Sequence, residues 1–434
     1  MRVRSGQKIS GKTMLFFSML IYKFATDIAY WYVLTVVDAV TYTADFNLFK
    51  YIAGIIVCII LFFGIDFKGK KASTFLLYLV FLLQIIPITT IYSMANDSTA
   101  YYFATCTSFF ACEILVAHTN AKKLLKRKLL VSQLMLFAFA FFTALLFVAV
   151  IKGNGLPGLT ALNIYKVYEM RAAGTFQISK YMNYILTWAT GAFLPIFLAK
   201  SILDKKYHVS AICVLAEVVI YLYTGHKTYL FSIPLVVACS IWSRRENFFV
   251  ELFFCFCVGF ALLVTALFVT EQTKSGVFYE IYSLFGRRCI IVPANNKFKY
   301  FDFFSNYPKL GIYGILPTWI LDVDSYYENV KYTYLISEIY YNKPDMNCNT
   351  GFLAEGYMRF GYIGIPMIML LFAVVLKMVD GLQLQTSYPL AVSLFVYPVF
   401  SLADAHLLSS MFFGPWMIYL FILIFYKGKK GSVS

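Results

Sequence analysis

The feature that most constrains this chain is a series of twelve apolar stretches, each long enough to cross a lipid bilayer. A spanning helix needs about 20 consecutive apolar residues, and these stretches are apolar all round rather than striped along one face. They lie at about 14–36, 48–65, 73–93, 100–118, 129–150, 178–199, 209–224, 228–242, 248–269, 351–376, 388–403 and 409–426. We therefore predict an all-α polytopic integral membrane protein that forms a single transmembrane domain over residues 1–434.

The composition supports this prediction. Hydrophobic residues make up 60% of the chain and charged residues 14%. In a soluble domain, hydrophobic residues make up about 45–50% and charged residues about 25%. These departures exclude a soluble globular enzyme, a disordered protein and a nucleic-acid-binding domain. The first stretch is too long and too polar at its end to be a cleavable signal peptide, so we expect it to be a span.

The distribution of charge predicts the topology. The chain carries 37 Lys and Arg against 22 Asp and Glu, and seven short segments hold 21 of these basic residues. Those segments are 1–13, 66–72, 119–128, 200–208, 243–247, 377–387 and 427–434. The alternate connections 37–47, 94–99 and 404–408 contain no Lys or Arg. The positive-inside rule then places both termini in the cytoplasm. A miscounted span within 209–242 is the alternative, and it would put the basic C-terminal tail outside.

Two outer connections are long, at 151–177 and about 270–350, and they indicate a function on the outer face. The second contains Cys289 and Cys348, which either form a disulfide or stay free; the other seven cysteines lie within spans. Neither the cysteines nor the acids of the large loop have the spacing of a zinc or calcium site. We expect no metal and no cofactor.

Ionisable residues inside spans usually face a bundle interior or a polar cavity. Lys23 and Asp27 are four residues apart, a spacing that favours a self-neutralising pair. Glu113 lies in the fourth span. Glu217, near the middle of the seventh, either faces a cavity or pairs with a basic group on another helix.

Several basic residues are predicted to lie on the outer side, where the positive-inside rule predicts few. The tight turn before the eighth span carries His226 and Lys227, at a helix N-terminus that itself favours anions. The remaining outer basic residues of interest are Arg171, Lys180, Arg287 and Arg288. Arginine is the preferred clamp for phosphate, although anchoring at the membrane interface is the ordinary alternative.

The large loop is rich in aromatic residues, with 11 Tyr and Trp319 between positions 270 and 350. Aromatic faces and tyrosine hydroxyls suit the binding of sugars, and an interfacial aromatic belt is the alternative. We select Tyr300 and Asp302 as candidate sugar ligands. Beyond the loop, Glu355 and Arg359 lie four residues apart at the start of the tenth span, where they form either an intrahelical pair or part of a site.

Four short stretches resemble segments of the oligosaccharide repeat-unit polymerases, or O-antigen polymerases of the Wzy type. They are RAAG at 171–174, GHK at 225–227, the RR…PA…YFDFF segment at 287–304 and TGFLAEGYMRFGYIG at 350–364. The number of spans and the two outer loops resemble that family as well. The resemblance implies glycosyl transfer on the outer face of the bacterial plasma membrane. There, a glycan on undecaprenyl pyrophosphate is extended by a new lipid-linked repeat unit.

On this interpretation the reaction is an inverting transfer without a metal. Arg171, Lys227 and Arg287 or Arg288 stabilise the leaving pyrophosphate. Glu355 and His406 are the candidate bases, and His226 is the third. The expected partners are the lipid-linked oligosaccharide, membrane lipid and a chain-length regulator protein, with no nucleic acid.

Two other functions stay open at this point. A ligase would move a finished glycan from the same lipid carrier to another acceptor. A flippase or transporter for the lipid-linked sugar would instead predict inverted repeats and short loops, which are not visible in the sequence.

Overall fold

The computed structural model describes residues 11–32, 34, 42–67, 69–120, 129–158, 161, 176–226, 228–271, 275–313, 315 and 330–427. Throughout those ranges every regular element is a helix. Seven helical segments are long and apolar enough to cross a membrane. They are Ala72–Met94, Thr99–His118, Leu130–Asn154, Lys180–Leu203, Tyr207–Thr224, Phe248–Thr270 and Phe352–Gln383. The prediction of an all-α, multi-pass membrane protein is confirmed, while the count of twelve spans stays a prediction.

Within the described residues each predicted apolar stretch lies mainly in helix, and the stretch at 409–426 is interrupted between Phe412 and Pro415. In chain order the α-helices are α1 (Gly11–Tyr32), α2 (Leu48–Gly64), α3 (Ala72–Val80), α4 (Ile86–Met94), α5 (Thr99–His118), α6 (Leu129–Asn154), α8 (Lys180–Trp188), α9 (Leu194–Leu203), α10 (Tyr207–Thr224), α11 (Thr228–Trp242), α12 (Phe248–Thr270), α13 (Val277–Tyr282), α14 (Val292–Asn306), α15 (Tyr332–Tyr341), α16 (Phe352–Gln383), α17 (Tyr388–Ser401), α18 (Leu407–Phe412) and α19 (Pro415–Phe425). The large loop therefore contributes α13, α14 and α15 and is partly helical.

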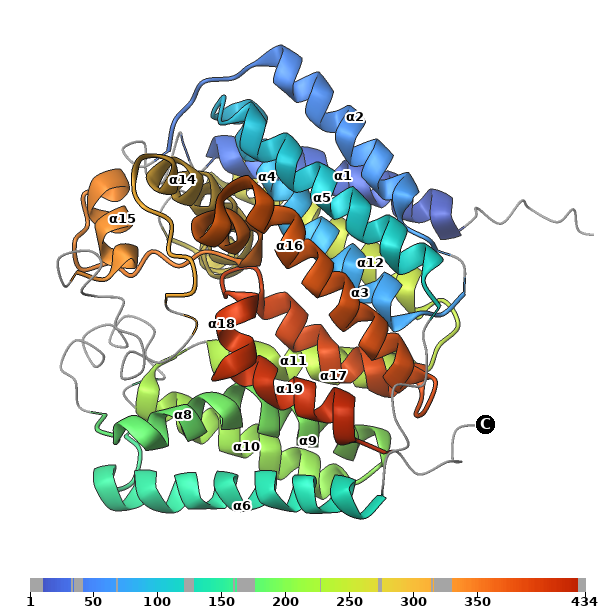
Figure 1. Cartoon of the computed structure of the whole chain (residues 1–434), viewed down its shortest axis with the longest axis vertical. Coiled ribbons are helices and arrows are strands. Elements are labelled where there is room, and N and C mark those ends of the chain that lie inside the picture. Colours follow the sequence, from blue (N-terminus) through green and yellow to red (C-terminus); the bar gives the residue numbers. More distant parts are fainter. Residues whose placement is uncertain are drawn as a thin grey trace, which may run out of the picture.

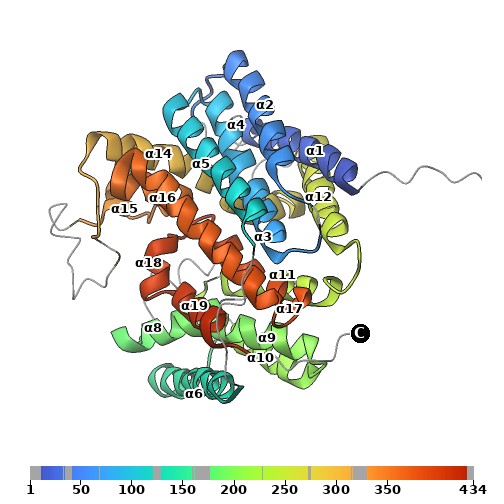
Figure 2. The ribbon, with the colours of Figure 1, turned by 45° about the vertical axis from the view of Figure 1, so that its right-hand side comes forward.

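The helices form two groups that meet along α16 and α17 (Figures 1 and 2). The first group contains α1 to α5 and α12, with α1 packed against α12 and α2 against α4. The second contains α6, α8 to α11 and α19. Helix α16 packs on α3 and α5, whereas α17 contacts α3 on one side and α9 and α11 on the other. These two helices therefore form the centre of the bundle.

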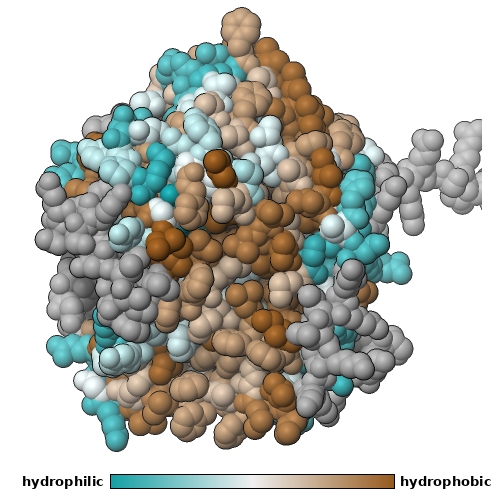
Figure 3. Space-filling view, in the orientation of Figure 1, coloured by the Kyte–Doolittle hydropathy of each residue, from teal (hydrophilic) through white to brown (hydrophobic). Residues whose placement is uncertain are grey.

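The two ends of the bundle differ in chemistry. The start of α1 and the end of α19 lie at one end, which we call the terminal end; α14, α15 and α18 lie at the opposite, loop end (Figure 1). The short connections α2–α3, α9–α10 and α11–α12, which contain Lys70, Lys205 and Arg244, lie at the terminal end. Between the two ends, apolar side chains run down the middle of the visible face (Figure 3). This is the surface that a membrane-embedded bundle presents to lipid.

Three wide π-helical segments are complete within the described residues: Phe81–Ile85, Ala189–Phe193 and Ser283–Ile291. A proline follows two residues after the end of each segment, at Pro87, Pro195 and Pro293. Proline donates no backbone N–H and its ring clashes with the carbonyl four residues earlier, so the wider turn relieves that clash. One of the carbonyls released in this way, on Gly191, accepts a hydrogen bond from the Tyr419 hydroxyl at 3.3 Å.

Helix α16 is interrupted about two turns after its start. Gly361 has a φ of +63°, in the left-handed region that favours glycine, and Phe360 is also non-helical. The break folds the first turns back so that Gly356 and Gly364 touch through their backbones. A Cβ atom on Gly364 would lie only 1.9 Å from the carbonyl oxygen of Gly356. The break separates the first segment, Phe352–Arg359, from the longer apolar remainder of the helix.

We expect Gly364→Ala to lower the thermal midpoint of the detergent-solubilised protein, because the new methyl group overlaps backbone that has no room to move. Overpacking of this kind costs about 1–3 kcal/mol. Gly259→Ala in α12 is the matched control, since a Cβ there meets nothing within 4 Å. The control should be neutral or slightly stabilising, and equal effects of the two changes would contradict the close approach.

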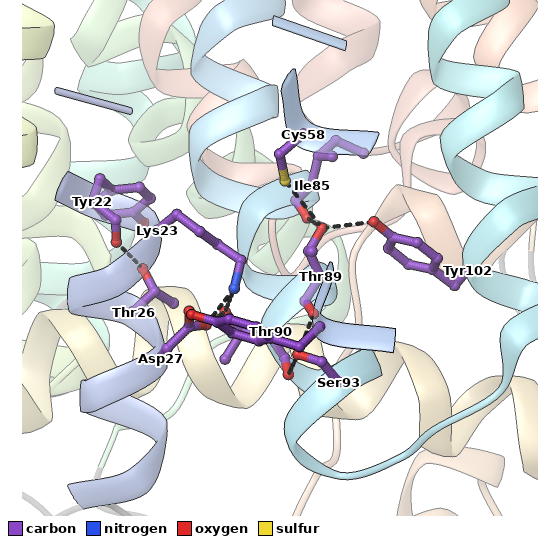
Figure 4. A network of polar contacts seen from close by, with 11 residues as sticks. Tyr22, Lys23, Thr26, Asp27, Cys58, Ile85, Thr89, Thr90, Ser93 and Tyr102 are labelled. Carbon is purple, nitrogen blue, oxygen red and sulfur yellow. Dashed lines mark hydrogen bonds and ion pairs between the residues drawn. The ribbon is translucent and has the colours of Figure 1, made fainter. Parts of the chain in front are cut away.

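The Lys23–Asp27 pair forms as its spacing predicts, and it belongs to a larger buried network (Figure 4). The Asp27 carboxylate accepts hydrogen bonds from the Lys23 ammonium, from the Thr90 hydroxyl at 2.6 Å and from the Tyr51 hydroxyl at 3.1 Å. Every charge in this network is compensated. It therefore ties α1 to α2 and α4 and has the character of a structural ion pair.

Glu217 forms no ion pair with a basic residue among the described residues. It is fully buried, and its carboxyl group accepts a hydrogen bond from the Ser232 hydroxyl on α11. Glu113 is also buried, and neither of its oxygens has a hydrogen-bond partner within the described ranges.

All nine cysteines are free, so Cys289 and Cys348 are not bridged.

Candidate functional site

A cavity of about 640 Å³ opens at the loop end, and we call it the loop-end cavity. It brings together two of the residues selected from the sequence, Lys180 on the first turn of α8 and His406 immediately before α18. Its polar lining residues are Lys180, Asn183, Thr187, Asn349, Thr350, Asp404, His406, Ser409 and Ser410. They come from three separate parts of the chain. A concave site with convergent polar groups is the usual form of a small-molecule site.

His406 supplies the group in this cavity best suited to accept a proton. Its ring nitrogen Nε2 is buried and has no hydrogen-bond partner in the part of the chain that the structure describes. Burial lowers the pKa of His406; the Glu355 carboxylate opposes this shift, and Arg359 and Lys331 add to it. The imidazole is therefore neutral near neutral pH and able to take a proton from a hydroxyl group.

Asp404 lines the same cavity, and Lys297 lies buried nearby. The Asp404 side chain stays open to the cavity, but the surrounding protein raises its pKa, an effect that Lys297 opposes. The Lys297 ammonium donates hydrogen bonds to the carbonyl oxygens of Pro293 and Ala403, each at 3.1 Å. Burial lowers the pKa of Lys297 to about 7, and Asp404 opposes this shift. The Lys297 ammonium is thus held at the backbone of Ala403, the residue before Asp404.

Glu355 and Arg359 form a buried ion pair, with 3.0 Å between Glu355 Oε1 and Arg359 Nε. The Arg359 guanidinium also donates to the carbonyl oxygens of Gly311 and Tyr313, at 3.2 and 2.7 Å, and to the Ser409 hydroxyl at 2.8 Å. Glu355 Oε2 accepts from the backbone N–H of Leu408 at 2.9 Å. The pair therefore fastens α16 to the chain around Gly311 and to α18.

This arrangement corrects the role expected for both residues. Glu355 is fully buried and both of its oxygens already accept hydrogen bonds, so it is not placed as an available base. Arg359 is likewise 1% exposed and directed toward protein groups rather than toward a ligand. Their contact with α18 instead positions the turn that carries His406.

Arg287 and Arg288 lie in the π-helical segment before α14 and do not line the loop-end cavity. Arg288 is exposed and Arg287 is half-buried. Burial and the Asp404 carboxylate raise the pKa of the Cys289 thiol to about 12, and Arg288 opposes this shift.

Tyr300 does not face a ligand-accessible surface, contrary to the expectation of a sugar contact. It is 1% exposed, and its hydroxyl donates to the carbonyl oxygen of Cys348 at 2.6 Å. Asp302 is exposed, but its carboxylate accepts a hydrogen bond from the Tyr340 hydroxyl at 2.6 Å, away from the loop-end cavity. In the described part of the large loop, these two tyrosine hydroxyls therefore bind other residues of the same loop.

His226 ends the turn after α10, where its ring packs on that of Tyr229 with 5.7 Å between centroids. Arg171 and Lys227 lie outside the described residues, so their positions relative to the cavity stay predictions. Lys297 and Asn349, by contrast, were not selected from the sequence. A lysine within a polar, aromatic loop gives no local sign that tertiary packing will bury it.

No cluster of three or more His, Cys, Asp or Glu side chains is placed to hold a metal ion within the described ranges. No family model matches the chain, and no curated protein or solved structure is significantly similar to it.

Proposed function

We propose that this protein is a glycosyltransferase of the bacterial plasma membrane that polymerises oligosaccharide repeat units carried on undecaprenyl pyrophosphate. The observation that carries the proposal is the loop-end cavity, where a cationic side chain, a carboxyl group and a neutral imidazole converge at one end of a membrane bundle. A pyrophosphate-linked glycolipid carries its anion at this depth, with sugars in water and its chain in lipid. With both termini cytoplasmic, the cavity faces the outer side.

The proposed reaction is a single inverting displacement without a metal. An acceptor hydroxyl forms a bond to the anomeric carbon while the bond from that carbon to the phosphate oxygen breaks. The electron pair leaves with the lipid pyrophosphate, and the hydroxyl proton passes to His406 Nε2. Lys180 stabilises the negative charge that develops on the leaving group, with Arg171, Lys227, Arg287 and Arg288 as the further proposed cations.

Removing the proposed anion contacts should stop polymerisation. In a cell that makes its surface polysaccharide with this protein, Arg171→Ala or Arg288→Ala should leave single repeats and abolish the ladder of longer chains. Arg244→Ala at the terminal end is the control, since that exposed guanidinium binds only the Leu203 carbonyl oxygen among the described residues. Normal chain length in both outer variants, with the protein present at normal abundance, would reject the assignment.

A purified-protein assay distinguishes the related functions. Protein reconstituted in lipid and supplied with lipid-linked repeat units should form new glycosidic bonds between repeats. Transfer of a preformed polymer onto a second acceptor, without extension, would identify a ligase. Movement of the substrate between leaflets without any new bond would identify a flippase or transporter. A chain-length regulator protein, if it binds, should narrow the distribution of product lengths.

A further inference from the structure

A second large cavity lies at the terminal end, far along the bundle from the loop-end cavity. It measures about 810 Å³ and is enclosed by the start of α1, the connection between α2 and α3, the end of α5 and the start of α12. We call it the basic cavity; the side chains that define it chemically are Lys12, Lys70, Lys71, Arg245, Phe63 and Phe67. None of these residues contributes to the proposed glycosyl transfer.

The cations of this cavity are only partly neutralised. Lys71 pairs with Asp66 at 2.8 Å, and Arg245 lies 3.7 Å from Glu251. Lys12 and Lys70 have no carboxylate partner within the described ranges. Asp66 and Glu246 are the acidic residues that line the cavity, against the four basic ones. The cavity therefore retains an excess of positive charge that an anion can neutralise.

The basic cavity also has an aromatic wall. The Lys12 ammonium lies over the rings of Phe63 and Phe67, 4.9 and 5.7 Å from their centroids. This cation–π contact holds the Lys12 ammonium against the two rings that line the cavity, and its positive charge stays available to an anion. Phe63 is 56% exposed, so the wall continues onto the surface of the bundle that faces lipid.

An apolar track leads away from the cavity along α2. Ile52, Ile56, Ile60 and Phe63 recur every three or four residues on one side of that helix, and all are exposed. Because Phe63 itself lines the cavity, the track begins where the cavity ends. A molecule with an anionic head and long apolar chains matches this combination, whereas a soluble anion would leave the track unused.

We propose that the basic cavity binds the phosphate-bearing headgroup of an anionic membrane phospholipid, with its acyl chains lying along α2. Basic pockets between transmembrane helices are suited to such headgroups, and each lysine near the membrane surface strengthens the attraction. The inference depends only on the cavity lying at the membrane boundary. It does not rest on the proposed function.

The test is native mass spectrometry of the full-length protein titrated with phosphatidylglycerol and with phosphatidylethanolamine. Phosphatidylglycerol should bind preferentially, and the Lys12→Gln/Lys70→Gln protein should lose about five-fold in affinity for each lysine removed. Lys205→Gln/Lys206→Gln is the matched control, because it removes the same charge from the same end of the bundle but outside the cavity. The control should keep the preference, and Lys12→Arg/Lys70→Arg should keep it as well.

Three results would overturn the proposal. Equal losses in the Lys12/Lys70 and Lys205/Lys206 variants would mean that only the diffuse surface charge attracts the lipid. Displacement of bound phosphatidylglycerol by millimolar inorganic phosphate would identify a soluble anion as the occupant. Equal binding of the two lipids by the wild-type protein would also reject the site, and that comparison needs no variant to fold.

Discussion

Arg359→Met should destabilise the folded protein by about 3–5 kcal/mol, the cost of breaking a buried ion pair by removing one partner. The change leaves the Glu355 carboxylate 0% exposed and without its cation. It also removes the donors that hold the carbonyl oxygens of Gly311 and Tyr313 and the Ser409 hydroxyl. The measurement is equilibrium unfolding in mixed micelles, compared with the wild-type protein.

Lys200→Met provides a control with the same spacing. Lys200 and Asp204 also form a pair four residues apart, at 2.6 Å, but their side chains are 32% and 44% exposed. Solvent screens such a pair, so its loss should cost about 0–1 kcal/mol. The double change Arg359→Met/Glu355→Leu should recover part of the stability, because it leaves no uncompensated charge. Similar costs for Arg359→Met and Lys200→Met would show that burial of the Glu355–Arg359 pair does not govern its contribution to stability.

Local properties explain why the helices could be predicted from the sequence. A spanning segment depends on its own apolar composition, so the stretch predicted at 129–150 corresponds to a helix at Leu129–Asn154. Spacing within one helix is equally local, and the pairs Lys23–Asp27 and Glu355–Arg359 both form as their four-residue separation predicts. The π-helical segments were not predicted, although each precedes a proline.

The candidate site was less predictable because it depends on distant contacts. The spacing of Glu355 and Arg359 indicates that they pair, but not that Ser409 and Leu408 occupy their remaining hydrogen-bonding positions. Lys297 bonds to the carbonyl of Ala403, 106 residues away, and nothing near Lys297 in the sequence indicates that contact. Whether a side chain is free to take part in a reaction thus depends on contacts from distant parts of the chain, whereas residue type and spacing belong to the local sequence.

On the proposed mechanism, His406→Gln should reduce the rate of glycosidic bond formation by about 10²–10⁴-fold, the usual contribution of a positioned general base. Glutamine keeps hydrogen-bonding atoms at this position but cannot take up the acceptor proton at neutral pH. The rate should be measured with purified protein and lipid-linked repeat units under single-turnover conditions. His208→Gln at the terminal end is the control, since His208 is exposed at the start of α10 and far from the loop-end cavity.

The pH profile separates a base from a residue that only shapes the cavity. The reactive form of His406 is the neutral imidazole, and burial lowers its pKa below the usual 6.5. The wild-type rate should therefore hold as the pH falls to 6.5 and decline only when His406 becomes protonated at lower pH. In His406→Gln that decline should disappear along with most of the rate. A variant that is slow but keeps the acidic decline would assign the titration to another group, with Asp404 the nearest alternative on the cavity wall. In that case Asp404→Asn, rather than His406→Gln, should remove the decline in rate at acidic pH.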